Sequence, residues 1–113
     1  MTDTKKHSLR FFYSEELQEK TIKVLTEIEQ AEDPLKGRDA LGSLVAELTD
    51  SGMGYYFIEG LELAKVGFVT KQTANLGISG AVKIMGSVIR KIIGGMNKEQ
   101  LLIISGYIRK LMQ

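Results

Sequence analysis

A chain of 113 residues, of which 43% are hydrophobic and 26% charged, has enough apolar surface to form one folded domain, which excludes a wholly disordered chain. It contains no cysteine, which excludes disulfides, thiolate zinc sites and redox-active thiols. The net charge of +1 conceals a division, because residues 1–62 hold 13 of the 14 acids and 7 of the 15 bases, whereas residues 63–113 hold 8 bases and one acid. The first part therefore carries a formal charge of −6 and the second +7.

We predict a single domain over residues 1–113, with residues 1–8 as a flexible arm. The bases near the N-terminus are not followed by an apolar run long enough for the core of a signal peptide, so we expect a cytoplasmic protein. Leu9 to Tyr13 is the one stretch that could be extended. A lone strand has no partner, so we expect this stretch to pack as an arm or as an early helical turn.

The first predicted helix begins after Ser14, whose hydroxyl can accept from the free amides of a first turn that contains Glu15 and Glu16. Its apolar positions recur at steps of three and four residues up to about Ala31. Asp33-Pro34 then predicts a stop, because proline disfavours helical geometry in the residue before it and has no amide hydrogen.

Leucine and valine residues at helical spacing predict a second helix over residues 38–50, and the Ser-Gly-Met-Gly segment at 51–54 predicts its end, because glycine readily adopts a positive φ. Residues 55–69 are apolar on most sides. This composition predicts a third helix at the centre of the domain.

A break near residues 75–77 is predicted to separate this third helix from a fourth over residues 78–93, which the Gly94-Gly95 pair would end. Asn97 followed three residues later by Gln100 has the form of a capping box and predicts a fifth helix. The expected fold is therefore all-α, a compact bundle of about five helices around a central, apolar, glycine-containing hairpin.

Three small residues, Gly60, Ala64 and Gly67, would share one stripe of the predicted third helix. Each glycine inside a helix costs about 1 kcal/mol relative to alanine, so a compensating close approach of two helices is expected. The stripe predicts a tight hairpin or a dimer seam, although glycines that mark helix ends would give the same spacing.

The basic half offers a second candidate surface, in which Lys83, Arg90 and Lys91 share one side of the predicted helix 78–93 opposite an apolar side. Such a helix is typical of proteins that lie on a membrane, but any core-packed helix with a basic solvent side has the same pattern. Charges interrupt the apolar segments too often for a membrane span. Nucleic-acid binding through the basic half is also open, without a recognisable reading element.

Catalytic constellations are absent from the sequence. His7 is the only histidine and lies in the arm, so no histidine-based metal site forms within one chain. Glu59 and Glu62 are three residues apart beside Lys65, a pattern more typical of a solvated strip than of an acid–base pair. We therefore expect no enzyme activity, no catalytic residues, no metal and no cofactor.

The predicted function is a non-catalytic helical interaction module, with a homo-oligomer, most simply a homodimer, as the first expectation and another protein as a possible partner. The alternative is a peripheral protein that binds lipid or an apolar ligand through helix 78–93. The second alternative is a nucleic-acid-binding protein that uses the basic half.

Overall fold

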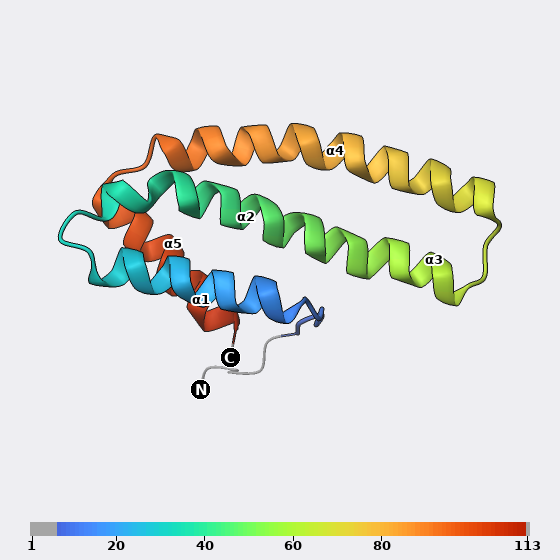
Figure 1. Cartoon of the computed structure of the whole chain (residues 1–113), viewed down its shortest axis with the longest axis horizontal. Helices are drawn as coiled ribbons and strands as arrows, with labels where there is room; N and C mark the ends of the chain where they lie inside the picture. The colour runs from blue at the N-terminus through green and yellow to red at the C-terminus, as the bar shows by residue number, and fades with distance from the viewer. Residues whose placement is uncertain (1–6, 113) are drawn as a thin grey trace.

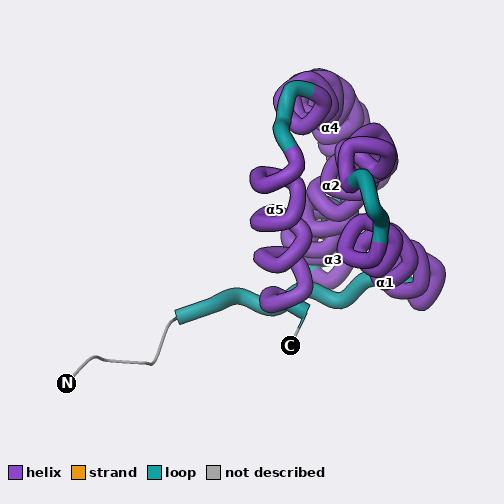
Figure 2. The backbone as a smooth tube through the Cα atoms, turned by 90° about the vertical axis from the view of Figure 1, so that its left-hand side faces the viewer, coloured by secondary structure: helices purple, strands orange, loops and turns teal. Residues whose placement is uncertain are grey.

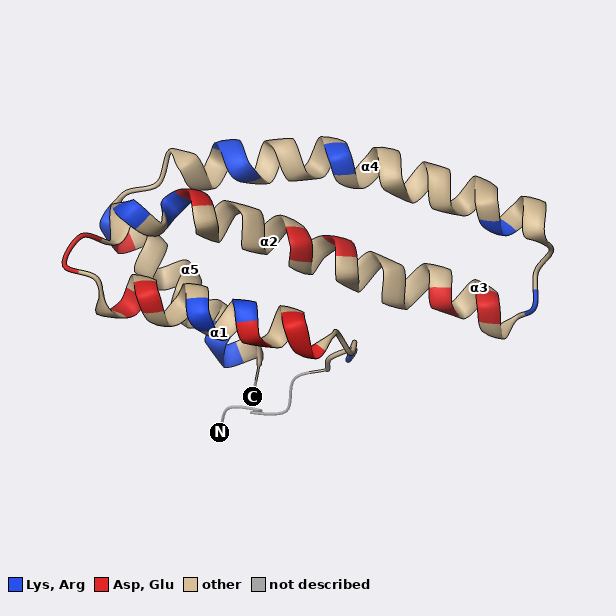
Figure 3. Cartoon of the chain, viewed as in Figure 1, with Lys and Arg blue, Asp and Glu red and all other residues tan. Residues whose placement is uncertain are grey.

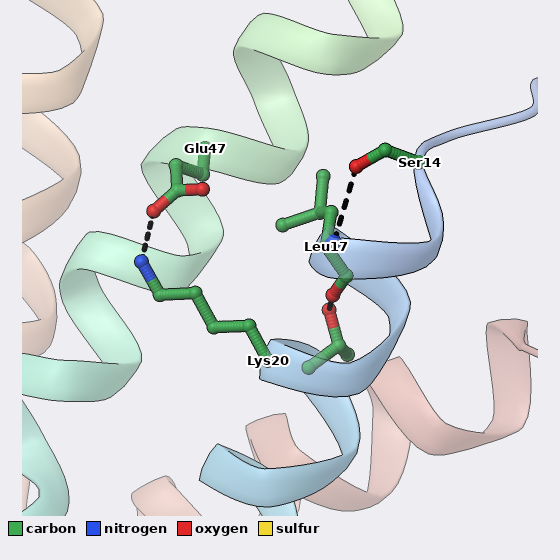
Figure 4. A network of polar contacts seen from close by, with 5 residues as sticks. Ser14, Leu17, Lys20 and Glu47 are labelled. Atoms are coloured by element: carbon green, nitrogen blue, oxygen red, sulfur yellow. Dashed lines mark hydrogen bonds and ion pairs between the residues drawn. The ribbon is translucent and has the colours of Figure 1, made fainter.

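The first helix begins where the sequence predicts. In the computed structural model, which describes residues 7–112, α1 extends over Glu15–Gln30. The Ser14 hydroxyl accepts a hydrogen bond from the amide of Leu17 at 3.1 Å (Figure 4). Glu15 and Glu16 lie in the first turn of the helix. The capping side chain and the two acids near the positive end of the helix dipole therefore lie where the sequence predicts them.

A short connection leads from α1 to a much longer helical rod. The Asp33 carboxylate accepts from the Leu35 amide and caps the 3-10 turn η1 (Pro34–Gly37), which is followed directly by α2 (Arg38–Met53). The rod continues through the π-helical segment η2 (Gly54–Ile58) into α3 (Glu59–Leu63). The predicted second and third helices are thus one rod.

The predicted helix end at residues 51–54 is wrong. Neither glycine in this segment has a positive φ, so the conformational freedom that ends helices is not used here. Gly52 is buried beside the Phe11 ring, and a Cβ atom placed on it would lie 3.8 Å from that ring, an ordinary contact distance. Glycine at this position therefore takes helical geometry and does not reverse the chain.

The chain reverses at residues 64–67, inside the helix that the sequence predicts over 55–69. Lys65 has a φ of 57°, the left-handed conformation that ends many helices, and Gly67 is the N-cap of α4 (Phe68–Gly94). The predicted break at 75–77 is also wrong, because these residues lie within α4. A glycine such as Gly77 weakens a helix by only about 1 kcal/mol and does not interrupt it.

The last helix, α5 (Lys98–Leu111), begins with the predicted capping box. The Asn97 side chain accepts from the Gln100 amide at 2.9 Å, and the Gln100 side chain accepts from the Asn97 amide at 2.9 Å. Both groups satisfy backbone donors that the helix leaves free.

Replacing Asn97 by alanine is expected to lower the free energy of unfolding by about 0.5–2 kcal/mol, because the first turn of α5 then loses its side-chain acceptor. Urea denaturation followed by circular dichroism measures the change. Asn97→Ser keeps an acceptor and is the matched control, which should lose much less. Equal and negligible losses in both variants would contradict the role of the cap.

Figure 1 shows the rods in space. The α2–α3 rod and α4 run side by side as a long hairpin, and α1 lies along α2 on the side away from α4. The last helix, α5, follows the C-terminal end of α4 and packs against α1. The view in Figure 2 shows helices and loops only. Within residues 7–112 the fold is all-α, as predicted, but it contains four continuous rods rather than five helices.

The hydrophobic core lies at one end of the hairpin. Its buried residues come from α1, α2, the C-terminal end of α4 and α5: Leu17, Val24, Leu25, Ile28, Leu41, Leu44, Ile93, Leu101 and Ile108. The prediction that residues 55–69 form the centre is wrong, because α1 and α5 do not extend over that part of the hairpin and cannot cover it (Figure 1). The radius of gyration is 16.4 Å, above the 13 Å or so of a compact domain of about this length.

The described part of the N-terminal segment is an arm, one of the two predicted forms. The Phe11 ring lies 5.9 Å from that of Tyr56, and the Phe12 ring lies 5.8 Å from that of Tyr55. The Tyr56 hydroxyl donates to the Leu9 carbonyl at 2.8 Å. These contacts hold the arm against η2. Most of the predicted flexible segment 1–8 lies outside the described residues.

Candidate interaction surface

The part of the hairpin beyond the core, residues 54–82, is the hairpin tip. None of its residues is buried. Its exposed large apolar side chains are Tyr56, Phe57, Leu63, Phe68, Val69 and Leu76. Leu63 is 81% exposed and Phe68 77%, so these two side chains flank the chain reversal almost free of contact. A cluster of this kind is typical of a surface that meets a partner.

A groove of about 550 Å³ separates the two helical segments of the tip. Ile58 from η2 faces Ile78 and Val82 from α4 across it, and three carboxylates, Asp50, Glu59 and Glu62, lie at its edges. The two glutamates are exposed, as expected for a solvated strip. Glu62 pairs with Lys71 at 2.6 Å, and this ion pair joins α3 to the first turn of α4.

The predicted small-residue stripe does not form along one helix. Gly60 lies in α3, Ala64 ends that helix, and Gly67 begins α4, because the chain reverses between them. A Cβ atom added at Gly60 or Gly67 would meet no atom within 4 Å. The stripe is thus not a contact within the chain, and its part in a contact between chains stays a prediction.

The close approach of helices occurs instead between α2 and α4, near the core. A Cβ atom added at Gly42 would lie 3.4 Å from the Cα atom of Arg90, and one added at Gly86 would lie 3.7 Å from the Cβ atom of Ala46. Both glycines are buried. Small residues therefore do allow two backbones to approach, as the glycine content predicts, but at other positions. The spacing of Gly42 and Ala46, four residues apart, is the signal for this site in the sequence.

Part of the charge division is neutralised within the chain. Lys71 pairs with Glu62, Lys98 lies 3.9 Å from Asp33, and Arg109 donates to both carboxylate oxygens of Glu29 at 2.9 and 3.0 Å. Each pair joins a base of the second part to an acid of the first. The hydrogen bonds to Glu29 raise the pKa of the Arg109 guanidinium above its ordinary value. A further pair, Lys20 with Glu47, joins α1 to α2 (Figure 4).

The three predicted basic residues, Lys83, Arg90 and Lys91, are exposed on α4. None of the ion pairs formed within residues 7–112 includes them. Figure 3 shows that α4 carries basic residues and no acidic ones. Arg90 differs from the two lysines because its backbone lies against Gly42, at the edge of the contact between α2 and α4.

The described residues hold neither a candidate metal site nor a membrane-spanning helix. His7 is exposed, and no group of three or more histidine, aspartate or glutamate side chains within residues 7–112 could hold a metal ion. In the same range, no helix combines the length and hydrophobicity that crossing a bilayer requires. Comparison of the chain with models of protein families, with curated proteins and with solved structures gave no match.

Proposed function

We propose that the protein is a non-catalytic helical interaction module that self-associates through the hairpin tip. The single observation that carries this proposal is the tip itself, in which Leu63, Phe68, Val69 and Leu76 are at least 70% exposed beyond the reach of the core. Burial of one such side chain stabilises a contact by about 1.5–3 kcal/mol. Association would therefore bury the apolar side chains that the fold leaves exposed.

The charge of the tip favours a second copy as the partner. Residues 54–82 contain two acids, Glu59 and Glu62, and two bases, Lys65 and Lys71. Their formal charges cancel, so two tips meet without net repulsion. A charged partner would gain little from such a surface.

The shape of the tip also favours a symmetric pair. In a two-fold dimer the same surface is used on both copies, and two helical hairpins laid together give the four-helix arrangement common in bundles. The exposed positions of α3 and α4 would then form one apolar centre. Gly60 and Gly67, which have open space at their Cα atoms, would allow the second copy to approach closely.

Sedimentation velocity over a range of concentrations tests the proposal. We expect a dimer that persists at high ionic strength, because a hydrophobic contact is not weakened by screening. The double variant Leu63→Ser, Phe68→Ser changes four side chains in a dimer, and we expect its dissociation constant to rise at least about 100-fold.

The matched control is Ile103→Ser, Leu111→Ser, at two positions of α5 that are each 65% exposed. This variant should dimerise as the unchanged chain does. A chain that remains monomeric at all concentrations, or a dimer that both double variants weaken equally, would overturn self-association through the tip.

A further inference from the structure

The groove between the two helical segments of the tip is acidic along one side only. Its three acids, Asp50, Glu59 and Glu62, all come from the α2–α3 rod, and we call them the acidic wall. The residues that α4 contributes to the groove are uncharged. Within residues 7–112, Asp50 and Glu59 take part in no ion pair. The acidic wall therefore keeps a negative charge that the described part of the chain does not neutralise.

Across the groove, α4 presents a line of hydrogen-bond donors. Asn75 and Ser79 line the groove one helical turn apart. Lys83 follows Ser79 after another turn and continues the line toward the core, and Gln72 precedes Asn75 by three residues. All four side chains are exposed and can donate to a carboxylate, so we call them the donor line.

Two close contacts between α2 and α4 show how the acidic wall and the donor line are aligned: Gly42 with Arg90, and Ala46 with Gly86. Four residues along α2 thus correspond to four residues back along α4. One further step brings Asp50 level with Val82, and both of these residues line the groove. Lys83 therefore lies at almost the same level of the hairpin as Asp50.

The side of the hairpin that carries these two residues faces away from the core. Asp50 is nine residues after Leu41, which turns it about 180° from that core residue. Lys83 lies about 120° around α4 from Ile89, which packs against the core. Figure 2 shows α5 on one side of the layer that α4, α2 and α1 form. Asp50 and Lys83 therefore lie on the side away from α5, where a second copy can approach.

Apolar side chains of the tip border the same side. Phe68 and Leu76 line a second hollow together with Asn75 and Ser79. Because the groove is lined by the same asparagine and serine, the two hollows are continuous. A second copy that covers the groove therefore also covers Phe68 and Leu76, two of the exposed apolar residues on which the proposed self-association depends.

We infer that the dimer forms through this side of the hairpin, with α4 of each copy lying over the acidic wall of the other and Lys83 of one copy facing Asp50 of the other. The inference rests on the self-association proposed above. The two-fold axis then runs along the hairpin, so both chain reversals lie at the same end of the dimer. Neighbouring rods are antiparallel, as in a four-helix bundle.

Charge selects this arrangement over the other way of laying the same two sides together. A two-fold axis across the hairpin would place the α2–α3 rod of one copy on that of the other, and the two acidic walls would meet. Like charges opposite each other weaken a contact. An axis along the hairpin instead brings Lys83 to Asp50 and the amides of Gln72 and Asn75 to the two glutamates. A separate basic helix would match the acidic wall but would repel Lys83.

Two charge reversals, followed by sedimentation velocity at low ionic strength, test the inference. Asp50→Lys and Lys83→Asp each place like charges at both contacts of a dimer, so we expect each to raise the dissociation constant at least about tenfold. In a mixture of the two variants, each contact again joins an acid to a base. We therefore expect the mixed dimer to form as tightly as the unchanged one. An ion pair formed within one chain could not be restored by mixing.

The matched control is Lys91→Asp, the same change of charge at another exposed residue of α4. Lys91 lies two turns closer to the core and about 80° further around the helix than Lys83. This variant should dimerise as the unchanged chain does, and equal weakening would overturn the specific contact. A mixture that stays dissociated, or a tighter dimer of Asp50→Lys, would overturn the arrangement while self-association stands. A chain that is always monomeric would overturn both.

A second measurement reports the direction of the axis. The chain has no cysteine, so Gly67→Cys places a single thiol at the chain reversal, where an added Cβ atom meets nothing within 4 Å. A short thiol-specific cross-linker should join the two copies of this variant, because both reversals lie at the same end. Ile22→Cys, at an exposed position of α1, is the control and should not be cross-linked. A dimer that is not cross-linked through Gly67→Cys would contradict an axis along the hairpin.

Discussion

Replacing Leu41 by alanine is expected to lower the free energy of unfolding by about 2–5 kcal/mol. Leu41 is completely buried in the core formed by α1, α2, α4 and α5, so its truncation removes apolar contacts and leaves a cavity that the four rods cannot fill by a small shift. Such a loss is a large share of the stability of a small domain. Denaturant unfolding measures it.

The matched control for this prediction is Leu76→Ala, a truncation of the same side chain where it is 70% exposed on α4. At concentrations low enough for the chain to be monomeric, its effect on the free energy of unfolding should stay within about 0.5 kcal/mol. Comparable losses at both positions would mean that the hairpin tip is covered in the folded chain, contrary to the structure.

Replacing Gly42 by leucine is expected to lower the free energy of unfolding by about 1–3 kcal/mol or more. A Cβ atom at this position already lies 3.4 Å from the backbone of Arg90, so the remainder of a leucine side chain would push α4 away from α2. The Arg90 backbone cannot move aside as a flexible side chain would. Thermal unfolding of the variant measures the loss.

Gly60→Leu is the control for overpacking, because a Cβ atom there meets nothing within 4 Å. Leucine is the better helix former, so this change should leave the stability of the single chain unchanged or slightly higher. A loss at Gly60 as large as that at Gly42 would place the close contact on the predicted stripe and contradict the observed one.

The parts of the fold that the sequence predicts correctly depend on contacts between near neighbours. Ser14 caps α1, and Asn97 with Gln100 caps α5, through side chains that lie within three residues of their partners. The proline at position 34 likewise stops helical geometry by its own ring. Such local effects act in the same way whatever the rest of the chain does.

The errors come from contacts between distant residues. The glycines at 52 and 54 permit a helix end, but the helical rod continues through both, and Gly52 is buried beside the Phe11 ring, a contact with a residue 41 positions away. The chain reversal uses a positive φ at Lys65, which is not a glycine, so the sequence gives no local signal for it. The apolar residues 55–69 predict burial, but α1 and α5 do not extend to cover them. Spacing alone therefore located the wrong glycines for the helix contact, although it correctly placed Lys83 and Lys91 on an exposed side of the helix.

The π-helical segment Gly54–Ile58 has a consequence for the direction of the side chains of α3. The Glu59 amide donates to the Gly54 carbonyl, five residues back instead of four, so the rod holds one extra residue at this point. One residue turns an α-helix by about 100°, and the side chains of α3 are rotated by that amount relative to an uninterrupted continuation of α2. The exposed apolar side chains of α3 therefore point about 100° away from the direction in which an uninterrupted α2 would carry them.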